Sequence, residues 1–366
     1  MTATTGTTGT DTTADPAGFG VVSETDLGVV RTARAQFRPR VRVVTIGLVL
    51  ALLGVGCWAL VMGSFSIPIT DVPRILLGDG DHMESVVVNR IRLPRLTLGV
   101  LIGVALGISG AVFQSLVENE LASPDIIGIT QGSSLGAIVC IVVLNSAAPM
   151  VSTAALGGGL ATAAVIYLLA YKQGISGYRL ILVGIGVGAC LGAYTGFLML
   201  RAEEDELARA TLWLIGSLNG ATWDLAVPLA VALVVFGSMA LVLRRQLRVL
   251  QLGNDTSAGI GVRVNASKGA ILVAGVGLAA FATAAAGPIT FIAFVSPPAT
   301  RRMLGNGDPA LLLSGLFGAV LLAGADVLGR YGIAGYELPV GVVTGILGAP
   351  YLVYQLIRSN KQGTGG

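Results

Sequence analysis

Charged residues are scarce in this sequence, and that scarcity excludes a soluble domain. Only 12% of the 366 residues are charged, whereas 54% are apolar and the mean hydropathy is +0.81. A soluble domain of this length needs far less apolar material for its core. Lipid, rather than water, is therefore the main solvent of the chain.

Ionisable groups are also rare inside the apolar stretches, which bears on how the protein could be driven. The acidic residues cluster between these stretches, and Asp326 is the exception nearest a helix interior. An ion-coupled carrier normally needs such groups deep in its helices. None of the three lysines follows a glycine, so the phosphate-binding loop of an ATPase is missing. We expect no catalytic residues here, and any ATP and Mg²⁺ must be used by partner subunits.

Cysteine and histidine are nearly absent, which argues against disulfides and metal centres. Cys57, Cys140 and Cys190 lie inside apolar runs, where a small side chain simply packs. His82, the single histidine, stands among acidic residues in a segment that is typical of a solvated loop. One imidazole and mobile carboxylates make no preorganised cage. We expect no metal and no directly bound cofactor.

What the sequence has instead is a series of apolar runs near the length that crosses a bilayer, about 20 residues. In lipid such runs must be helices, because their backbone polar groups cannot stay unpaired. The runs lie near 42–63, 96–117, 126–144, 153–171, 180–200, 224–243, 269–286, 288–300, 309–329 and 339–357, and the eighth is short. We predict an all-α integral membrane protein of about ten helices, with a flexible N-terminal tail (1–40), a ten-helix domain (41–358) and a C-terminal tail (359–366).

The basic residues predict the orientation. With ten crossings and both termini in the cytoplasm, 16 of the 23 Lys and Arg residues fall on the inner side. This bias satisfies the positive-inside rule. We therefore predict a multi-pass protein of the cell membrane with both termini cytoplasmic.

Glycine is abundant, with 52 residues, and several glycines recur every four positions. Such ladders let helix backbones approach closely. One ladder admits a second interpretation, because a stripe of small residues could also line a wide path for a bulky solute. It consists of Gly184, Gly188, Gly192 and Gly196.

Three blocks of sequence carry a family resemblance. The first is RLPRLTLGVLIGVALGISGAVFQSLVENELASPDIIGITQGSSLG at 92–136, and the second is LQLGNDTSAGIGVRV at 250–264. The third is GPITFIAFVSPPATRRMLG at 287–305, continued by ADVLGRYGIAGYELPVGVVTGILGAPYLVYQL at 325–356. Their order and spacing resemble the FecCD-like permeases of ABC importers for iron-siderophore complexes and cobalamin. The resemblance covers about residues 42–358 and is greatest to the second permease subunit of ferric-enterobactin-type systems.

The resemblance implies a type II importer, in which two permeases stand above two cytoplasmic ATPases and a solute-binding protein docks outside. By motif, Arg92, Arg95 and Arg330 would meet carboxylates of the binding protein, and guanidinium groups suit that role. The alternative for Arg92 and Arg95 is that they only reach toward the membrane interface.

Two further sets of residues carry over by motif. The cytoplasmic gate would be formed by Asn119, Leu121, Ser176 and Gly177; Glu120 stands where the family usually has proline, which leaves the chemistry of the gate open. The ATPase coupling segment would contain Leu252, Gly253, Asn254, Ala258 and Gly261. Without the motifs, both segments are ordinary polar loops.

The resemblance leaves the cargo and the pairing open. We expect half of a translocation pathway for iron(III)-siderophore complexes, with cobalamin or haem as alternative cargo. The sequence also admits an ion-coupled secondary transporter of similar cargo or a membrane scaffold that transports nothing. Pro298 stands where the family commonly has histidine, as in second permease subunits, so we expect a heterodimer with a related permease. No feature indicates nucleic-acid binding.

Overall fold

The computed structural model describes residues 24–63, 65, 67–172, 174, 176–305, 310–332 and 336–363. Its contacts divide the chain into two units, Met1–Val43 and Val44–Gly366. In the first unit the described residues are helical from Glu24 onward. The sequence predicts a flexible tail up to residue 40, but residues 24–38 lack proline and contain several Arg and Ala residues, which favour a helix. Residues 1–23 and 364–366 of the two expected tails lie outside the described residues.

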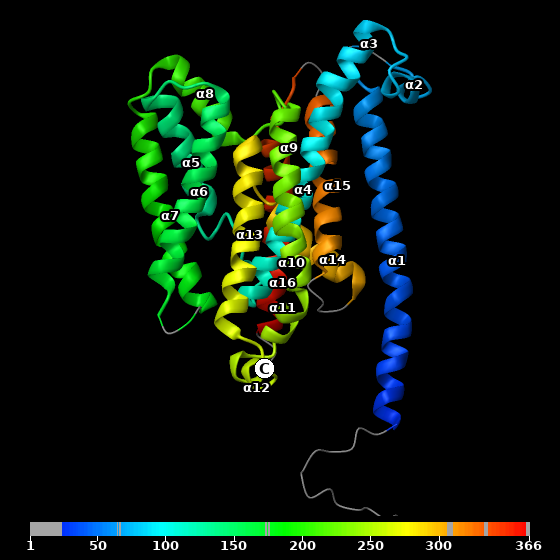
Figure 1. The fold of residues 1–366 in the computed structure, drawn as a ribbon, viewed down its shortest axis with the longest axis vertical. Helices are drawn as coiled ribbons and strands as arrows, with labels where there is room; N and C mark the ends of the chain where they lie inside the picture. Colours follow the sequence, from blue (N-terminus) through cyan, green and yellow to red (C-terminus); the bar gives the residue numbers. More distant parts are fainter. Residues whose placement is uncertain are drawn as a thin grey trace, which may run out of the picture. The chain divides into compact units, whose positions relative to one another are not determined.

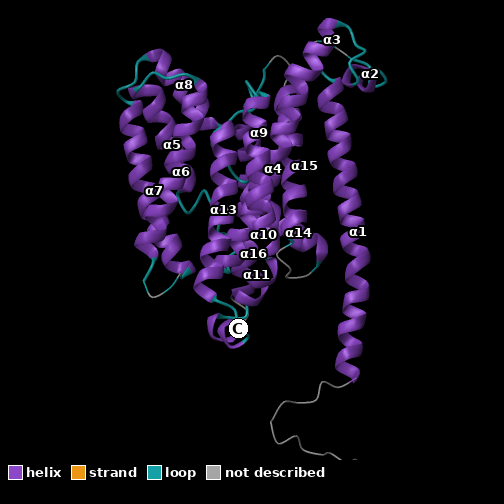
Figure 2. Ribbon diagram, in the orientation of Figure 1, coloured by secondary structure: helices purple, strands orange, loops and turns teal. Residues whose placement is uncertain are grey.

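Helices and connecting loops make up the described residues, and no strand occurs among them (Figure 2). The helices are α1 Glu24–Val61, α2 Val72–Leu76, α3 His82–Val86, η1 Val87–Arg92, α4 Leu93–Val117, α5 Ile129–Ile138, η2 Val139–Val143, α6 Ala148–Ala170, α7 Gly177–Met199, α8 Glu204–Ile215, α9 Trp223–Ala232, η3 Leu233–Gly237, α10 Ser238–Val242, α11 Arg244–Leu250, α12 Asn254–Gly259, α13 Val264–Ala286, α14 Ile292–Leu304, α15 Leu311–Tyr331 and α16 Val340–Gly363. The three η segments are π-helical and continue directly into or out of α-helices. The predicted all-α fold class is confirmed.

Among the described residues, seven helical segments are long and apolar enough to cross a membrane. They are Pro39–Val61, His82–Val117, Ala148–Ala170, Gly177–Met199, Trp223–Val242, Val264–Ala286 and Leu311–Tyr331. Two shorter apolar helices cover Ile129–Val143 and Val340–Gln355. These nine segments correspond to nine of the ten predicted runs, so the chain is a multi-pass membrane protein.

The remaining predicted run, 288–300, corresponds to α14 and is short. Its 13 residues rise about 20 Å, which is less than the roughly 30 Å of a hydrocarbon core. The backbone before it, from Gly287 to Phe291, is not helical, and Gly287, Pro288 and Ile289 are buried in protein. Irregular backbone is tolerated at membrane depth only in such an environment.

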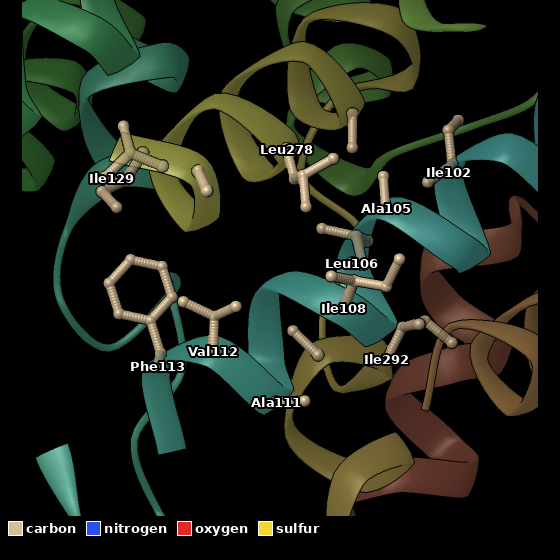
Figure 3. Packing of buried hydrophobic residues seen from close by; sticks show 14 of the residues in the cluster. Ile102, Ala105, Leu106, Ile108, Ala111, Val112, Phe113, Ile129, Leu278 and Ile292 are labelled. Atoms are coloured by element: carbon tan, nitrogen blue, oxygen red, sulfur yellow. The ribbon is translucent and has the colours of Figure 1, made fainter. Parts of the chain in front are cut away.

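Helix α4 is the centre of the larger unit. It packs against α13, α14 and α15, and Figure 1 shows it between α13 and α15. The closest approaches occur at glycines: a Cβ on Gly107 would overlap the carbonyl oxygen of Ser314 in α15, and one on Gly110 would overlap that of Ala293 in α14. Buried aliphatic side chains and Phe113 fill the space around α4 (Figure 3). Gly107 and Gly110 therefore allow close packing of α4 on α15 and α14.

Helices α5, α6 and α7 form a second packed group in the same unit. Gly132 and Gly136 of α5 face Gly158 of α6, where a Cβ on either side would overlap backbone of the other helix. The larger unit has two ends that matter below. The α8 end holds α3, α8 and the beginning of α9, whereas the α12 end holds α12 and the beginning of α13 (Figure 1).

Candidate functional site

The three arginines predicted to dock a binding protein all lie toward the α8 end, and Arg92 is the most enclosed. It is 4% exposed at the end of η1. Its Nη1 donates to the carbonyl oxygens of Leu60 (2.5 Å) and Val61 (3.1 Å), and Nη2 donates to that of Phe65 (2.5 Å). The last carbonyls of a helix lack intrahelical partners and attract cations. Arg92 thus caps the C-terminal end of α1.

Arg95 is paired within the chain. Its Nη2 lies 2.8 Å from Oδ1 of Asp326 in α15, and its Nε lies 3.1 Å from each carboxylate oxygen. Nη1 donates to Oδ1 of Asn219 (3.1 Å). Both charged side chains are largely buried, so the pair is a forked, enclosed ion pair that joins α4 to α15. It also neutralises the acidic residue that lies nearest a helix interior.

Arg330 differs from the other two in the contacts that the described residues make with it. Its buried Nε has no hydrogen-bond partner among the described residues, and its guanidinium lies 4.9 Å from the ring centroid of Tyr331. Tyr331 in turn donates to the carbonyl oxygen of Met62 (2.6 Å). The docking role stays a prediction for all three arginines, and Arg330 is the half-buried one, whose guanidinium lies against the ring of Tyr331.

The predicted gate residues come together at the α12 end. Asn119 follows α4, and its Oδ1 accepts a hydrogen bond from the backbone N–H of Leu121 (2.9 Å), which makes a tight local turn. Ser176 and Gly177 begin α7. A Cβ on Gly177 would lie 3.0 Å from Cα of Val117, so the start of α7 packs directly on the end of α4. The structure thus places the two gate segments against each other; their gating role stays a prediction.

The segment between α4 and α5, residues 118–128, is called the gate loop below. Two of its three carboxyl groups, those of Glu120 and Asp125, differ in environment. Glu120 accepts a hydrogen bond from Nε2 of Gln355 in α16 (2.6 Å). Burial raises the pKa of the Asp125 carboxyl to about 6, although a hydrogen bond from Oγ1 of Thr130 (2.6 Å) acts in the opposite direction. Sequence reasoning did not find the partner of Glu120, although a glutamine within an apolar run was a visible signal.

The predicted coupling residues occupy an exposed corner formed by α11 and α12. Leu252 is 61% exposed, and Gly253, Asn254, Ala258 and Gly261 are exposed as well. Gly253 and Gly261 have φ values of +95° and +90°, a region that side chains disfavour, and a Cβ on either would meet open space. These glycines therefore shape the two turns that flank α12.

Two residues of this corner were missed by sequence reasoning. Ile260 is 62% exposed and is the second large apolar side chain of this segment, eight residues after Leu252. Ser257 is fully buried, and its hydroxyl is within hydrogen-bonding distance of the carbonyl oxygens of Val249 (2.8 Å) and Gly253 (2.7 Å). Ser257 thereby fixes α12 against α11. The result is a shaped apolar corner, suited to a groove on another protein.

The glycine stripe of α7 changes character along its length. Gly184 packs on the backbone of Ile127, and Gly188 lies against Gly128. Gly192 approaches only the side chain of Gln131, at 3.5 Å, and a Cβ on Gly196 would meet nothing within 4 Å. The first half of the stripe serves packing and the second half is open. Its role in lining a pathway stays a prediction.

Comparisons with known proteins agree with this arrangement. The model of the FecCD transport family matches residues 49–358. The ferric enterobactin transport system permease protein FepG of Escherichia coli is 39% identical over 88% of this chain and 98% of its own. The iron(3+)-hydroxamate import system permease protein FhuG of Bacillus subtilis is 36% identical over 78% of this chain and 88% of its own.

A solved structure extends the comparison to three dimensions. It is described as an inward-facing conformation of a metal-chelate type ABC transporter. It aligns with a TM-score of 0.78 and 26% sequence identity, covering 87% of this chain and 99% of its own. The similarity therefore extends over nearly the whole membrane domain rather than over isolated motifs.

Proposed function

The chain belongs to the FecCD transport family, and from this premise we propose that it imports iron(III)-siderophore complexes as one permease subunit of an ATP-driven transporter. Its helices would form half of the translocation pathway. The observation that carries the proposal is sequence similarity over most of the chain, at 39% and 36% identity, to permeases whose names specify ferric enterobactin and iron hydroxamate. The exposed apolar corner at α12 supports it, because a subunit that hydrolyses no ATP itself needs a surface through which an ATPase can move it.

The partners follow from the same proposal. They are a second permease, two ATP-binding cassette subunits and an extracytoplasmic solute-binding protein. We place the α12 end in the cytoplasm, together with both termini, because the basic segment from Arg244 to Arg263 lies there. The α8 end would then face the binding protein.

We further propose that the second permease is a different chain. The support is the proline at position 298, where the family commonly has histidine. Pro297 and Pro298 are both buried inside α14, which packs on α4. The substitution therefore acts through the packing of α14 within this subunit, and a paired subunit would contribute the histidine-bearing form.

An ion-coupled mechanism has less support from the described residues. Its coupling site would need an ionisable group in the helices that can bind and release an ion. Asp326, the acidic residue nearest such a position, is engaged by Arg95 through both carboxylate oxygens. A neutralised pair of this kind suits structure better than ion exchange.

The test is uptake by vesicles reconstituted from this chain, its paired permease, the ATPase and the binding protein. We expect accumulation of radioactive iron from an iron-siderophore complex only with ATP and with the binding protein present. An ATPase variant that binds but does not hydrolyse ATP is the matched control. Uptake driven by a proton or sodium gradient without ATP would contradict the proposal, and uptake of cobalamin or haem in place of the siderophore would change the cargo.

A further inference from the structure

A cluster of polar side chains at the α12 end joins the gate loop to two helices. The carboxylate of Glu120 accepts a hydrogen bond from Nε2 of Gln355 in α16 (2.6 Å) and lies 3.7 Å from Nη2 of Arg301 in α14. Glu120 therefore connects the gate loop, which follows α4, to both α14 and α16.

The partners of Glu120 are held in place by further hydrogen bonds. Nη2 of Arg301 donates to Oε1 of Gln114 in α4 (2.6 Å), and Nε2 of Gln114 donates to the carbonyl oxygen of Phe294 (3.0 Å). Oε1 of Gln355 accepts from Nη2 of Arg302 (3.4 Å). Both amide side chains thus use donor and acceptor at once, which fixes their orientation.

Burial differs sharply across the cluster. Gln114 and Gln355 are nearly inaccessible, and the side chain of Arg301 is 15% exposed, whereas that of Glu120 is 58% exposed. Breaking the contacts inside the helices would leave buried polar groups unpaired, but Glu120 can leave the cluster and be hydrated. The rigid part of the cluster therefore belongs to the helices, and the releasable part belongs to the gate loop.

We propose that Glu120 is a positioning residue that ties the gate loop to α14 and α16 and that releases when the gate moves. The tie holds the loop, including Asn119 and Leu121, in one position against the beginning of α7. Its release would free the loop while α4, α14 and α16 keep their own contacts. This inference rests on the proposed transport function for its consequence, but the tie itself can be tested without transport.

The first test is hydrogen–deuterium exchange of the full chain in lipid nanodiscs. In Glu120→Ala, backbone amides of residues 118–123 should exchange about tenfold faster than in the wild type, because the hydrogen bond from Gln355 and the contact with Arg301 are both lost. Exchange in α4 and α13 should be unchanged. Glu118→Gln is the matched control: it removes the same charge from the same loop, but the Glu118 carboxylate interacts with Lys268 instead of the cluster.

An exchange of side chains makes the test independent of a general folding defect. Gln355→Glu alone places two carboxylates against each other and should accelerate loop exchange. Glu120→Gln combined with Gln355→Glu restores an amide–carboxylate pair of the same size with its direction reversed, and should return exchange toward the wild-type rate. The proposed attachment of the gate loop to α14 and α16 would be contradicted by a wild-type exchange rate in Glu120→Ala. It would also be contradicted if the loop of the double variant exchanged no more slowly than that of Gln355→Glu alone.

The consequence for transport is read in the reconstituted vesicles. With the loop released, ATP hydrolysis in the absence of cargo should rise several-fold in Glu120→Ala, the iron imported per ATP should fall, and the double variant should restore both. Unchanged coupling in Glu120→Ala would overturn the role in gating. An absence of ATP-dependent uptake in wild-type vesicles would instead refute the proposed function. The exchange experiment would still show whether Glu120 holds the gate loop against α14 and α16.

Discussion

The two ends of the larger unit use their functional candidates in opposite ways. At the α8 end, Arg92 and Arg95 are enclosed and their donors are engaged within the chain. At the α12 end, Leu252 and Ile260 extend into open surroundings on a corner that Ser257 fixes from below. Two of the three candidate arginines at the α8 end therefore have partners within the chain, whereas the α12 end has two exposed apolar side chains. The contrast predicts that the α12 corner, rather than Arg92 or Arg95, is covered by another protein.

Charge and exposure together decide which residues can act on another protein. A buried ion pair is lost only at high cost, so an arginine in one is poorly placed to change partners during a transport cycle. An exposed apolar side chain gains by being covered. The predictions below test this contrast at each end, from the largest expected effect to the smallest.

The largest effect is expected at the α12 corner. In Leu252→Asp combined with Ile260→Asp, two apolar anchors become charged, and their burial in an ATPase groove becomes unfavourable. We expect loss of all ATP-dependent uptake and loss of the ATPase from the purified complex, measured by pull-down. Thr256→Ala, on the exposed side of the same short helix, is the control and should retain both. Co-purification of the ATPase with the double variant would remove the corner from the interface.

The next largest effect is expected at Arg95. Arg95→Leu leaves the Asp326 carboxylate enclosed without its partner, and breaking a buried pair from one side typically costs about 3–5 kcal/mol. The variant should therefore unfold at a lower temperature in detergent. Arg95→Leu with Asp326→Leu removes both charges and should recover most of the loss. Wild-type stability of the single variant would show that the ion pair contributes little to the free energy of unfolding. Arg95 would then be a candidate for docking again.

The features tested by these two predictions differ in how far they could be predicted from the sequence. Apolar runs and the FecCD-like blocks predicted the helical membrane fold, because lipid allows few alternatives for a long apolar segment. The coupling residues were predicted by motif, and their exposure at one corner agrees with that role. The engagement of Arg92 with the end of α1 could not be predicted, because it depends on how two helices far apart in the sequence approach each other.

Other differences arise from local details that patterns do not encode. Gly184 and Gly196 belong to one stripe, yet Gly184 packs on Ile127 of the gate loop, whereas a Cβ on Gly196 would meet nothing within 4 Å. Gln114 and Gln355 are polar residues within apolar runs, but their partnership with Arg301 and Glu120 depends on the packing of α4, α14 and α16. Pairings between distant residues therefore account for most of what the sequence left open.

A smaller effect is expected from Asp125, in the gate loop outside the spanning helices. Its carboxyl has a pKa of about 6 in the folded chain, above the 3.8 of a free side chain. The folded state thus binds its proton more tightly, and stability should fall as the pH rises from about 4 to about 6, by no more than about 3 kcal/mol. Asp125→Asn should flatten this part of the profile and raise the unfolding temperature at pH 7.5.

The control for that profile is Asp255→Asn, an exposed carboxylate at the start of α12. It should leave the pH dependence between 4 and 6 close to that of the wild type. If Asp125→Asn retained the full wild-type dependence, the carboxyl that titrates in this range would lie elsewhere in the chain.

The smallest effect is expected from Arg330, the remaining candidate for docking at the α8 end. Because Arg330 is half-buried, Arg330→Glu should replace attraction with repulsion toward an acidic partner without breaking an ion pair in the described part of the chain. A partly exposed charge contributes about 1 kcal/mol, so we expect a several-fold weaker affinity for the binding protein, measured by surface plasmon resonance at low salt.

The difference in affinity between Arg330→Glu and the wild type should shrink at 0.5 M salt, because exposed charges are then screened. A salt-independent loss would instead indicate a changed fold, and an unchanged affinity at low salt would remove Arg330 from the docking role.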